Sequence, residues 1–401
     1  MTRHSRDRPD TELVHLGRDP RRHQGTVNTP VYRASTILFP TVADLERAAR
    51  GEYPGLTYGL HGLPTIDDLG HALAALEGGH AALMVPSGLT ATTLPFLALL
   101  QPGDHVLVTD AVYGPTRRFC DNQLRRLGID VGYYDPLIGA AIGDAFKPNT
   151  RLVFAESPGS LTFEVQDVPA IVSAAHARGA RVVLDNTWAT PLHCRAFEHG
   201  VDVEIQALTK FVAGHSDLLL GAVTTRTEEL YRTVRDGAST FGDCPAPDVC
   251  YEALRGLRTL AVRLRHHEAS ALRVAEWLAR RPEVARVLHP ALPEDPGHAI
   301  WKRDFRGASS LFGVLLRTGS ERAVAAMIDG LQLFKIGASF GGFESLVVPV
   351  RPERTARPWR ESGFLLRLHV GLEAVEDLIA DLETGFARLG AALHGEAEAA
   401  R

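Results

Sequence analysis

Short apolar runs alternate with amphipathic segments between residues 65 and 210. Residues 65–79 carry apolar side chains at helical spacing and end in two glycines, which predicts a helix with a glycine at its C-terminal end. Aliphatic and β-branched runs predict buried strands, and the segments between them predict helices: strands at 81–86, 104–110, 151–157, 180–188 and 202–210, helices at 87–100, 114–128 and 167–179. This alternation predicts a mostly parallel sheet covered by helices on both faces.

The pattern differs on either side of this region. The first 60 residues contain few periodic segments and a stretch that reads as extended chain, so we expect an arm that wraps a neighbouring subunit. Beyond residue 250 come a long helix and a mixture of strands and helices: a helix at 250–282, a strand at 309–318, a helix at 321–331 and two strand-like runs within 344–373. We therefore expect an arm at 1–60, an α/β domain at 61–250 and a smaller α+β domain at 251–401.

The composition excludes several classes of protein. The 401 residues are 45% hydrophobic and 23% charged, as in ordinary globular proteins. A net charge of −5 without a basic tract argues against a nucleic-acid partner. No apolar run is long enough to span a bilayer, and the polar opening segment does not resemble a signal peptide, so we expect a cytoplasmic protein without a membrane partner.

Cysteine and histidine spacing gives no sign of a metal centre. The four cysteines lack CxxC spacing, and the seventeen histidines include no HExxH motif. We therefore expect neither disulfide bonds nor a metal site.

Four predicted strand ends carry residues with distinctive chemistry. Ser87 and Gly88 join a strand to a helix whose first N–H groups would attract a phosphate, at the edge of the sheet where such folds bind ligands. Tyr113 follows the next strand, Asp185 ends another, and Lys210 ends the last. Singly, each position also fits a structural role, as a βα turn, a packed aromatic residue or a turn cap.

Asp185 and Lys210 together favour one cofactor. A lysine in a low-dielectric site becomes a usable amine nucleophile, and a buried aspartate needs a charged partner. Pyridoxal 5'-phosphate (PLP) requires a lysine for its aldehyde, an acid beside its ring nitrogen and a cradle for its phosphate. The order cradle, tyrosine, aspartate, lysine within one α/β domain therefore indicates a PLP site.

The segment ALTKFVAGHSD at 207–217 resembles the lysine signature of the Cys/Met-metabolism family of PLP-dependent enzymes. The similarity extends from residue 26 to residue 389 and is greatest to the cystathionine β-lyases of that family. The resemblance implies a PLP-dependent transferase-like fold of the aspartate aminotransferase type (fold type I). It also implies a homotetramer built from two catalytic dimers, acting on a small sulfur amino acid.

The resemblance also assigns roles to individual residues. It implies that Lys210 binds the cofactor aldehyde and later moves the substrate proton, that Asp185 pairs with the ring nitrogen, and that Tyr113 stacks on the ring. The remaining implied cofactor contacts surround the phosphate: Ser87, Gly88, Leu89, Thr209 and, from the neighbouring subunit, Tyr58.

Two further residues are implied at the substrate. Arg367 corresponds to the arginine that grips the α-carboxylate, a task suited to a bidentate guanidinium. Ser339 corresponds to a serine beside the lysine and the substrate, and Tyr58 is also expected to reach the substrate of the neighbouring subunit.

The sequence departs from the family pattern near the phosphate. Leu60 stands where the family commonly has a phosphate-binding arginine, with His61 next to it as a candidate substitute. Ala207 stands where a serine is common. Both changes are expected to weaken cofactor binding without touching the lysine.

Local features favour β-elimination over γ chemistry. Ser160 stands where γ-type relatives usually carry asparagine, and Ala338 where they often carry glutamate. Phe340 lies in an aromatic-Gly-Gly segment like that of the β-lyases, and Gly114 follows Tyr113 where a methionine γ-lyase would have a cysteine nearby. We expect a lyase that cleaves cystathionine to homocysteine, pyruvate and ammonia. The alternatives are a cystathionine γ-synthase or γ-lyase, a methionine γ-lyase, a cysteine or cystine desulfhydrase, and a non-catalytic PLP-binding regulator.

Overall fold

The computed structural model describes residues 9–399 and contains two β-sheets. The larger sheet has seven strands in the order β1-β7-β6-β5-β4-β2-β3. Their bounds in that order are Ala81–Val85, Gly221–Thr225, Val203–Gln206, Arg181–Asp185, Thr150–Glu156, His105–Thr109 and Asp130–Tyr134. Only β7 runs against its neighbours, so the mostly parallel sheet predicted from the sequence is confirmed.

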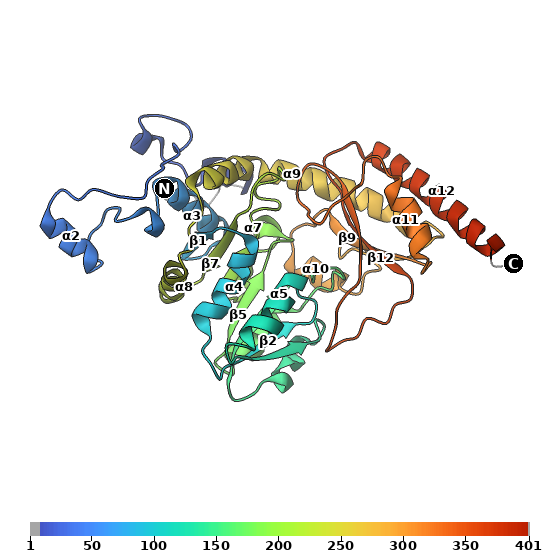
Figure 1. Ribbon diagram of the computed structural model, residues 1–401, viewed down its shortest axis with the longest axis horizontal. Coiled ribbons are helices and arrows are strands. Elements are labelled where there is room, and N and C mark those ends of the chain that lie inside the picture. The colour runs from blue at the N-terminus through green and yellow to red at the C-terminus, as the bar shows by residue number, and fades with distance from the viewer. Residues whose placement is uncertain (1–8, 400–401) are drawn as a thin grey trace.

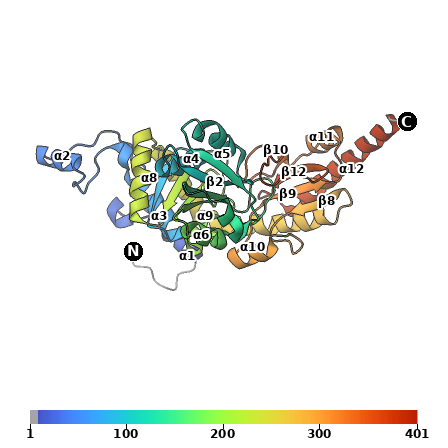
Figure 2. The same ribbon diagram turned by 90° about the horizontal axis from the view of Figure 1, so that it is seen from below.

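Helices cover both faces of the large sheet, as the views of Figures 1 and 2 together show. Successive residues of a strand enter opposite cores: Val183 packs under α4 and α8, whereas its neighbours Val182 and Leu184 pack under α6. This burial on both faces is why the strands read as continuous apolar runs. The α-helices around this sheet are α3 (Pro64–Glu77), α4 (Gly88–Leu99), α5 (Gly114–Phe119), α6 (Val168–His176), α7 (Thr190–His193) and α8 (Glu228–Phe241). A π-helical segment, η3 (Cys120–Leu124), and two 3-10 helices, η4 (Gly139–Ala145) and η5 (Ala196–His199), accompany them.

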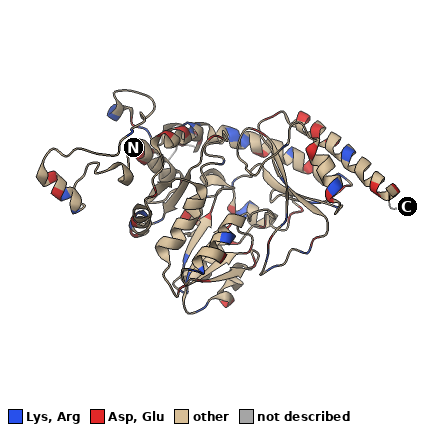
Figure 3. Cartoon of the chain, in the orientation of Figure 1, with Lys and Arg blue, Asp and Glu red and all other residues tan. Residues whose placement is uncertain are grey.

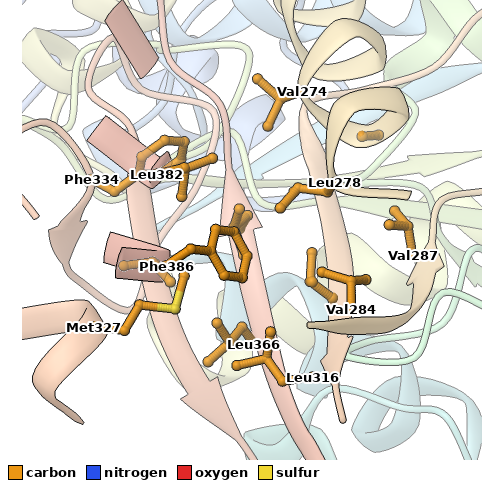
Figure 4. Close-up of a cluster of buried hydrophobic side chains, with 14 of the residues drawn as sticks. Val274, Leu278, Val284, Val287, Leu316, Met327, Phe334, Leu366, Leu382 and Phe386 are labelled. Atoms are coloured by element: carbon orange, nitrogen blue, oxygen red, sulfur yellow. The ribbon is translucent and has the colours of Figure 1, made fainter. Parts of the chain in front are cut away.

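The smaller sheet has five strands in the order β10-β11-β12-β9-β8. Their bounds in that order are Lys335–Ile336, Leu346–Val350, Phe364–His369, Leu311–Leu316 and Val284–Leu288. One face packs on α9 (Pro247–Ala279), α11 (Glu321–Asp329) and α12 (Val375–Ala399), with Leu278, Met327 and Phe386 at the centre of the apolar cluster in Figure 4. The short helix α10 (His298–Asp304) follows β8.

Helix α9 links the two sheets. Its first half buries Leu254 and Leu257 in the core beside α3, and its second half buries Val274 and Leu278 under the small sheet. One continuous helix therefore contributes to both cores, and Figure 2 shows it running between them.

The N-terminal segment projects from the body. After α1 (Pro9–His15) and η1 (Pro20–His23), the chain extends through α2 (Val42–Ala49) and returns at η2 (Gly59–His61). Helix α2 buries none of its residues, and both views place it at the opposite end of the molecule from α12. Residues 1–8 of the predicted arm and 400–401 of the predicted C-terminal domain lie outside the described residues.

Charged residues of both signs are interspersed along the exposed helices, including α2 and α12 in Figure 3. In the part of the chain that the structure describes, no helix combines the length and apolarity needed to cross a membrane.

The structure changes some of the predicted elements. The strand predicted to run to Lys210 ends at Gln206, and Lys210 lies in a turn closed by its own N–H donating to the carbonyl of Ala207 at 3.1 Å. Strands β3 and β7 were not predicted, because β3 mixes aspartate, glycine and tyrosine at a sheet edge and β7 is a small-residue run that only its neighbours identify.

Candidate active site

A cavity of about 260 Å³ lies where the strand ends of the large sheet face the small sheet. Its lining includes most of the residues that the sequence singled out, and it draws on both sheets. Those residues are Ser87, Gly88, Leu89, Tyr113, Asp185, Thr209, Lys210 and Arg367, joined by Ser160, Ala207, Ala338 and Phe340.

The start of α4 forms one wall of the cavity. Ser87 is its N-cap, and the Ser87 Oγ accepts the Thr90 N–H at 3.0 Å. Among the hydrogen bonds of the described residues, none occupies the N–H of Gly88 or Leu89, as expected for the first turn of a helix. A Cβ on Gly88 would lie 2.5 Å from the Cβ of Ala207, so only glycine permits this close approach. Two free N–H groups and the helix dipole thus face the cavity, an arrangement that binds phosphate.

Thr209 and Ala207 add less to this wall than the family pattern suggests. The Thr209 hydroxyl donates to the Leu220 carbonyl at 3.2 Å and accepts the Leu220 N–H at 3.0 Å, so it is engaged in holding two chain segments together. Ala207 offers no hydroxyl in this wall.

Asp185 ends β5 with its side chain at the cavity. Burial raises the pKa of Asp185, and the hydrogen bond that its Oδ1 accepts from the Thr187 N–H at 3.0 Å opposes that rise. A carboxylate in this position is stabilised by a cation that enters the cavity, such as a protonated pyridine nitrogen.

Lys210 lines the cavity from the turn that follows β6. Its Nζ donates to the Ser339 Oγ at 3.0 Å and lies 5.0 Å from the centre of the Phe340 ring. Burial lowers the pKa of Lys210 to about 8, and the positive charge of Arg367 contributes to the decrease. The unprotonated amine that a nucleophile or base requires is therefore far more populated near neutral pH than in an ordinary, solvated lysine.

Arg367 comes from β12 and lines the same cavity. Burial lowers the pKa of Arg367, yet the guanidinium remains a cation at physiological pH. Its Nη2 donates to the Ser339 carbonyl at 3.4 Å, and among the described residues it forms no ion pair with a carboxylate. A buried cation without a carboxylate partner is suited to bind a carboxylate of a ligand.

Tyr113 and Tyr58 occupy different places. Tyr113 follows β2, and its ring lines the cavity with 45% of the residue exposed. Tyr58 directly precedes η2 and is 47% exposed. Within residues 9–399, the cavity lining includes neither Tyr58 nor Leu60 nor His61.

The cavity lining includes an acidic residue that the sequence did not single out, Glu156. It is the last residue of β4, lines the cavity, and accepts the Tyr113 N–H on its Oε2 at 2.7 Å. The available signal was an acidic residue at the end of an apolar strand run, the same signal that identified Asp185.

The residues present fit PLP. The α4 start supplies donors and positive potential for a phosphate, Asp185 supplies an anion for a ring nitrogen, and Lys210 supplies an amine for an aldehyde. All three line one cavity, and the close approach of Gly88 to Ala207 in its lining requires a glycine.

Comparison with known proteins agrees with this fit. The sequence model described as Cys/Met metabolism PLP-dependent enzyme matches residues 10–387. The chain is 45% identical to cystathionine beta-lyase MetC of Escherichia coli, across 95% of this chain and 98% of that protein. It is 44% identical to cystathionine beta-lyase of Salmonella typhimurium over the same shares.

Solved structures share the whole fold. Cystathionine gamma synthase of Xanthomonas oryzae in complex with cystathionine superposes with a TM-score of 0.89 at 33% identity, across 96% of this chain and 100% of that chain. The predicted fold type I is thereby confirmed.

Proposed function

The chain belongs to the Cys/Met metabolism family of PLP-dependent enzymes, and we propose that it is a carbon–sulfur β-lyase that cleaves cystathionine to homocysteine, pyruvate and ammonia. The observation that carries this proposal is the convergence of Lys210, Asp185 and Arg367 on one cavity. The names of relatives 44–45% identical over 95% of the chain support the β-lyase assignment.

Arg367 and Lys210 have separate roles in the proposed reaction. Arg367 binds the substrate α-carboxylate. Because the side chains of Arg367 and Lys210 both donate hydrogen bonds to Ser339, a carboxylate bound at Arg367 places the substrate Cα near the Lys210 amine. When bound, PLP withdraws electrons from Cα and makes its proton acidic. The unprotonated Lys210 amine then removes that proton, and the thiolate leaves from Cβ.

The lining of the cavity favours cleavage at Cβ. γ-Elimination needs a second deprotonation, at Cβ, and so benefits from another acid–base group near the substrate side chain. Ala338 and Phe340 occupy the wall beside Lys210 and carry no such group. The carboxyl groups in the lining are Glu156 and Asp185, and both lie at the strand ends.

A γ-type reaction is the second candidate. The observation that favours it is the close superposition with cystathionine gamma synthase of Xanthomonas oryzae. Incubation of the purified protein with cystathionine tests the choice, because β-cleavage yields pyruvate and γ-cleavage yields 2-oxobutyrate.

The projecting segment supports an assembly of subunits. Leu38 is 88% exposed and Val42 is 73% exposed, and helix α2 buries none of its residues against its own chain. Apolar groups presented in this way are stabilised by a partner surface. We propose a cytoplasmic homotetramer in which residues 1–60 contact the neighbouring subunit and Tyr58 completes its site.

Mixed subunits test this assembly. A Tyr58→Ala chain and a Lys210→Ala chain should each be inactive alone and should regain activity when combined, because a hybrid dimer holds one intact site. Sedimentation of an active monomer would contradict the proposal.

A further inference from the structure

Glu156 and Asp185 form a pair of neighbouring acids that the steps above do not use together. They are the last residues of β4 and β5, they are in register across these parallel strands, and both line the cavity. In-register residues of parallel strands direct their side chains to the same face of the sheet. Two carboxyl groups therefore lie side by side where Asp185 alone is needed to meet a ring nitrogen.

Glu156 also holds the loop that carries Tyr113. This loop joins β2 to α5, and its residues are fixed individually rather than by a sheet ladder. The Asp110 N–H donates to the Tyr134 carbonyl at 2.9 Å, and the Ala111 carbonyl accepts the Ser160 N–H at 2.7 Å.

Tyr113 is another residue of this loop with a fixed backbone. Its N–H donates to Glu156 Oε2 at 2.7 Å, and its carbonyl accepts the Arg117 N–H at 3.0 Å in the first turn of α5. The bond to Glu156 is the one that ties the tyrosine backbone to the end of β4, beside Asp185. The orientation of the Tyr113 ring in the cavity thus depends on an acceptor supplied by residue 156.

We propose that Glu156 is a positioning residue whose carboxyl group fixes the backbone of Tyr113, so that the tyrosine ring is held over the cavity beside Asp185. This inference rests on the PLP site and is independent of whether the enzyme performs β- or γ-cleavage.

The charge state of Glu156 is compatible with this role. Burial raises the pKa of Glu156 well above its usual range and the neighbouring Asp185 raises it further, while the Tyr113 N–H and Arg354 act in the opposite direction. A neutral Glu156 still accepts the Tyr113 N–H and leaves Asp185 as the carboxylate for the ring nitrogen. Glutamine keeps an oxygen acceptor at the same reach and cannot ionise.

The test compares Glu156→Gln with Glu156→Ala in cofactor binding, without any measurement of turnover. Apoprotein is titrated with PLP, and the dissociation constant and the visible circular dichroism of the bound cofactor are recorded. Glu156→Gln should retain the affinity within about threefold, and Glu156→Ala should weaken it about tenfold or more and alter the dichroism band. The thermal midpoint of each apoprotein identifies any general loss of folding.

A double variant shows whether Glu156 acts through Tyr113. If it does, Glu156→Ala added to Tyr113→Leu should weaken PLP binding by much less than it does in the wild-type background. Wild-type affinity and dichroism in Glu156→Ala would overturn the proposal. Equally weakened PLP binding in Glu156→Gln and Glu156→Ala would also overturn it, because the charge of residue 156 and not its hydrogen-bond acceptor would then be the essential property.

Discussion

The Nζ of Lys210 donates a hydrogen bond to the Ser339 Oγ at 3.0 Å, across the boundary between the two sheets. The carbonyl of the same serine accepts from Arg367 at 3.4 Å. One residue of the smaller domain therefore contacts both the amine that acts on Cα and the guanidinium that binds the carboxylate. The reacting groups are aligned only when the two sheets are correctly packed.

Ser339→Ala should slow catalysis more than it weakens substrate binding. The variant leaves the Lys210 amine without its hydroxyl partner, so the amine is less well oriented and kcat should fall about tenfold. Steady-state kinetics with cystathionine measure this, and the thermal midpoint should stay close to that of the wild type. An unchanged kcat would show that this hydrogen bond does not orient the amine.

Cofactor uptake should depend on the protonation of Lys210. The amine must be unprotonated to attack an aldehyde, and burial together with Arg367 lowers the pKa of Lys210 to about 8. The rate at which apoprotein binds PLP should therefore rise with pH and level off above about 8. Stopped-flow absorbance measures the rate, and a rate that keeps rising to pH 10 would indicate an ordinary, solvated lysine.

Arg367→Ala should weaken substrate binding strongly. Loss of a bidentate charge-assisted contact to the α-carboxylate should lower kcat/KM about 10- to 100-fold, mainly through KM. Arg351→Ala is a matched control, because Arg351 lies just beyond β11 with a side chain 78% exposed and paired with Glu321. Equal effects of the two substitutions would exclude a specific role for Arg367.

Asp110→Asn should destabilise the contact between the large sheet and the loop after β11. The Asp110 carboxylate accepts the N–H groups of Thr355, Ala356 and Arg357 at 2.8–3.0 Å and pairs with Arg117 at 2.5 Å. Removing this charge leaves a buried arginine unpaired, so the free energy of unfolding should fall by about 3 kcal/mol. Chemical denaturation at pH 7 measures the loss.

The same carboxylate predicts how stability depends on pH. Burial acts to raise the pKa of Asp110, but the N–H groups of Arg357 and Thr355 together with Arg117 lower it overall. The contribution of Asp110 to the free energy of unfolding is therefore complete above the ordinary aspartate pKa of about 3.9, and it is lost as the pH falls below that value. Asp135→Asn is the control, because Asp135 pairs with Arg357 through a side chain that is 37% exposed. This substitution should lower the free energy of unfolding by less than about 1 kcal/mol.

Ala207→Ser should tighten cofactor binding. The Cβ of Ala207 lies against Gly88 at the start of α4, so a hydroxyl placed there adds a donor beside the phosphate cradle. The dissociation constant for PLP should fall about three- to tenfold. Fluorescence titration of the apoprotein measures this, and weaker binding would mean that the hydroxyl disturbs the contact with Gly88.

The sequence predicted the sheet and the positions of its ligand-binding ends because buried parallel strands leave clear apolar runs. It extended the last strand to Lys210, since the apolar run continues through Leu208, whereas the sheet ladder stops at Gln206. It did not predict the contact of Glu156 with Tyr113 or that of Asp110 with Thr355, which join residues 43 and 245 positions apart. Such contacts follow from tertiary packing and leave no local pattern.

The products formed from cystathionine test the central claim most directly. The purified protein is loaded with PLP and incubated with cystathionine, and the keto acids are separated by chromatography while thiols are quantified. We expect pyruvate with an equal amount of homocysteine, because the cavity wall at Ala338 and Phe340 offers no group for a second deprotonation. Predominant 2-oxobutyrate with cysteine would contradict the β-lyase assignment.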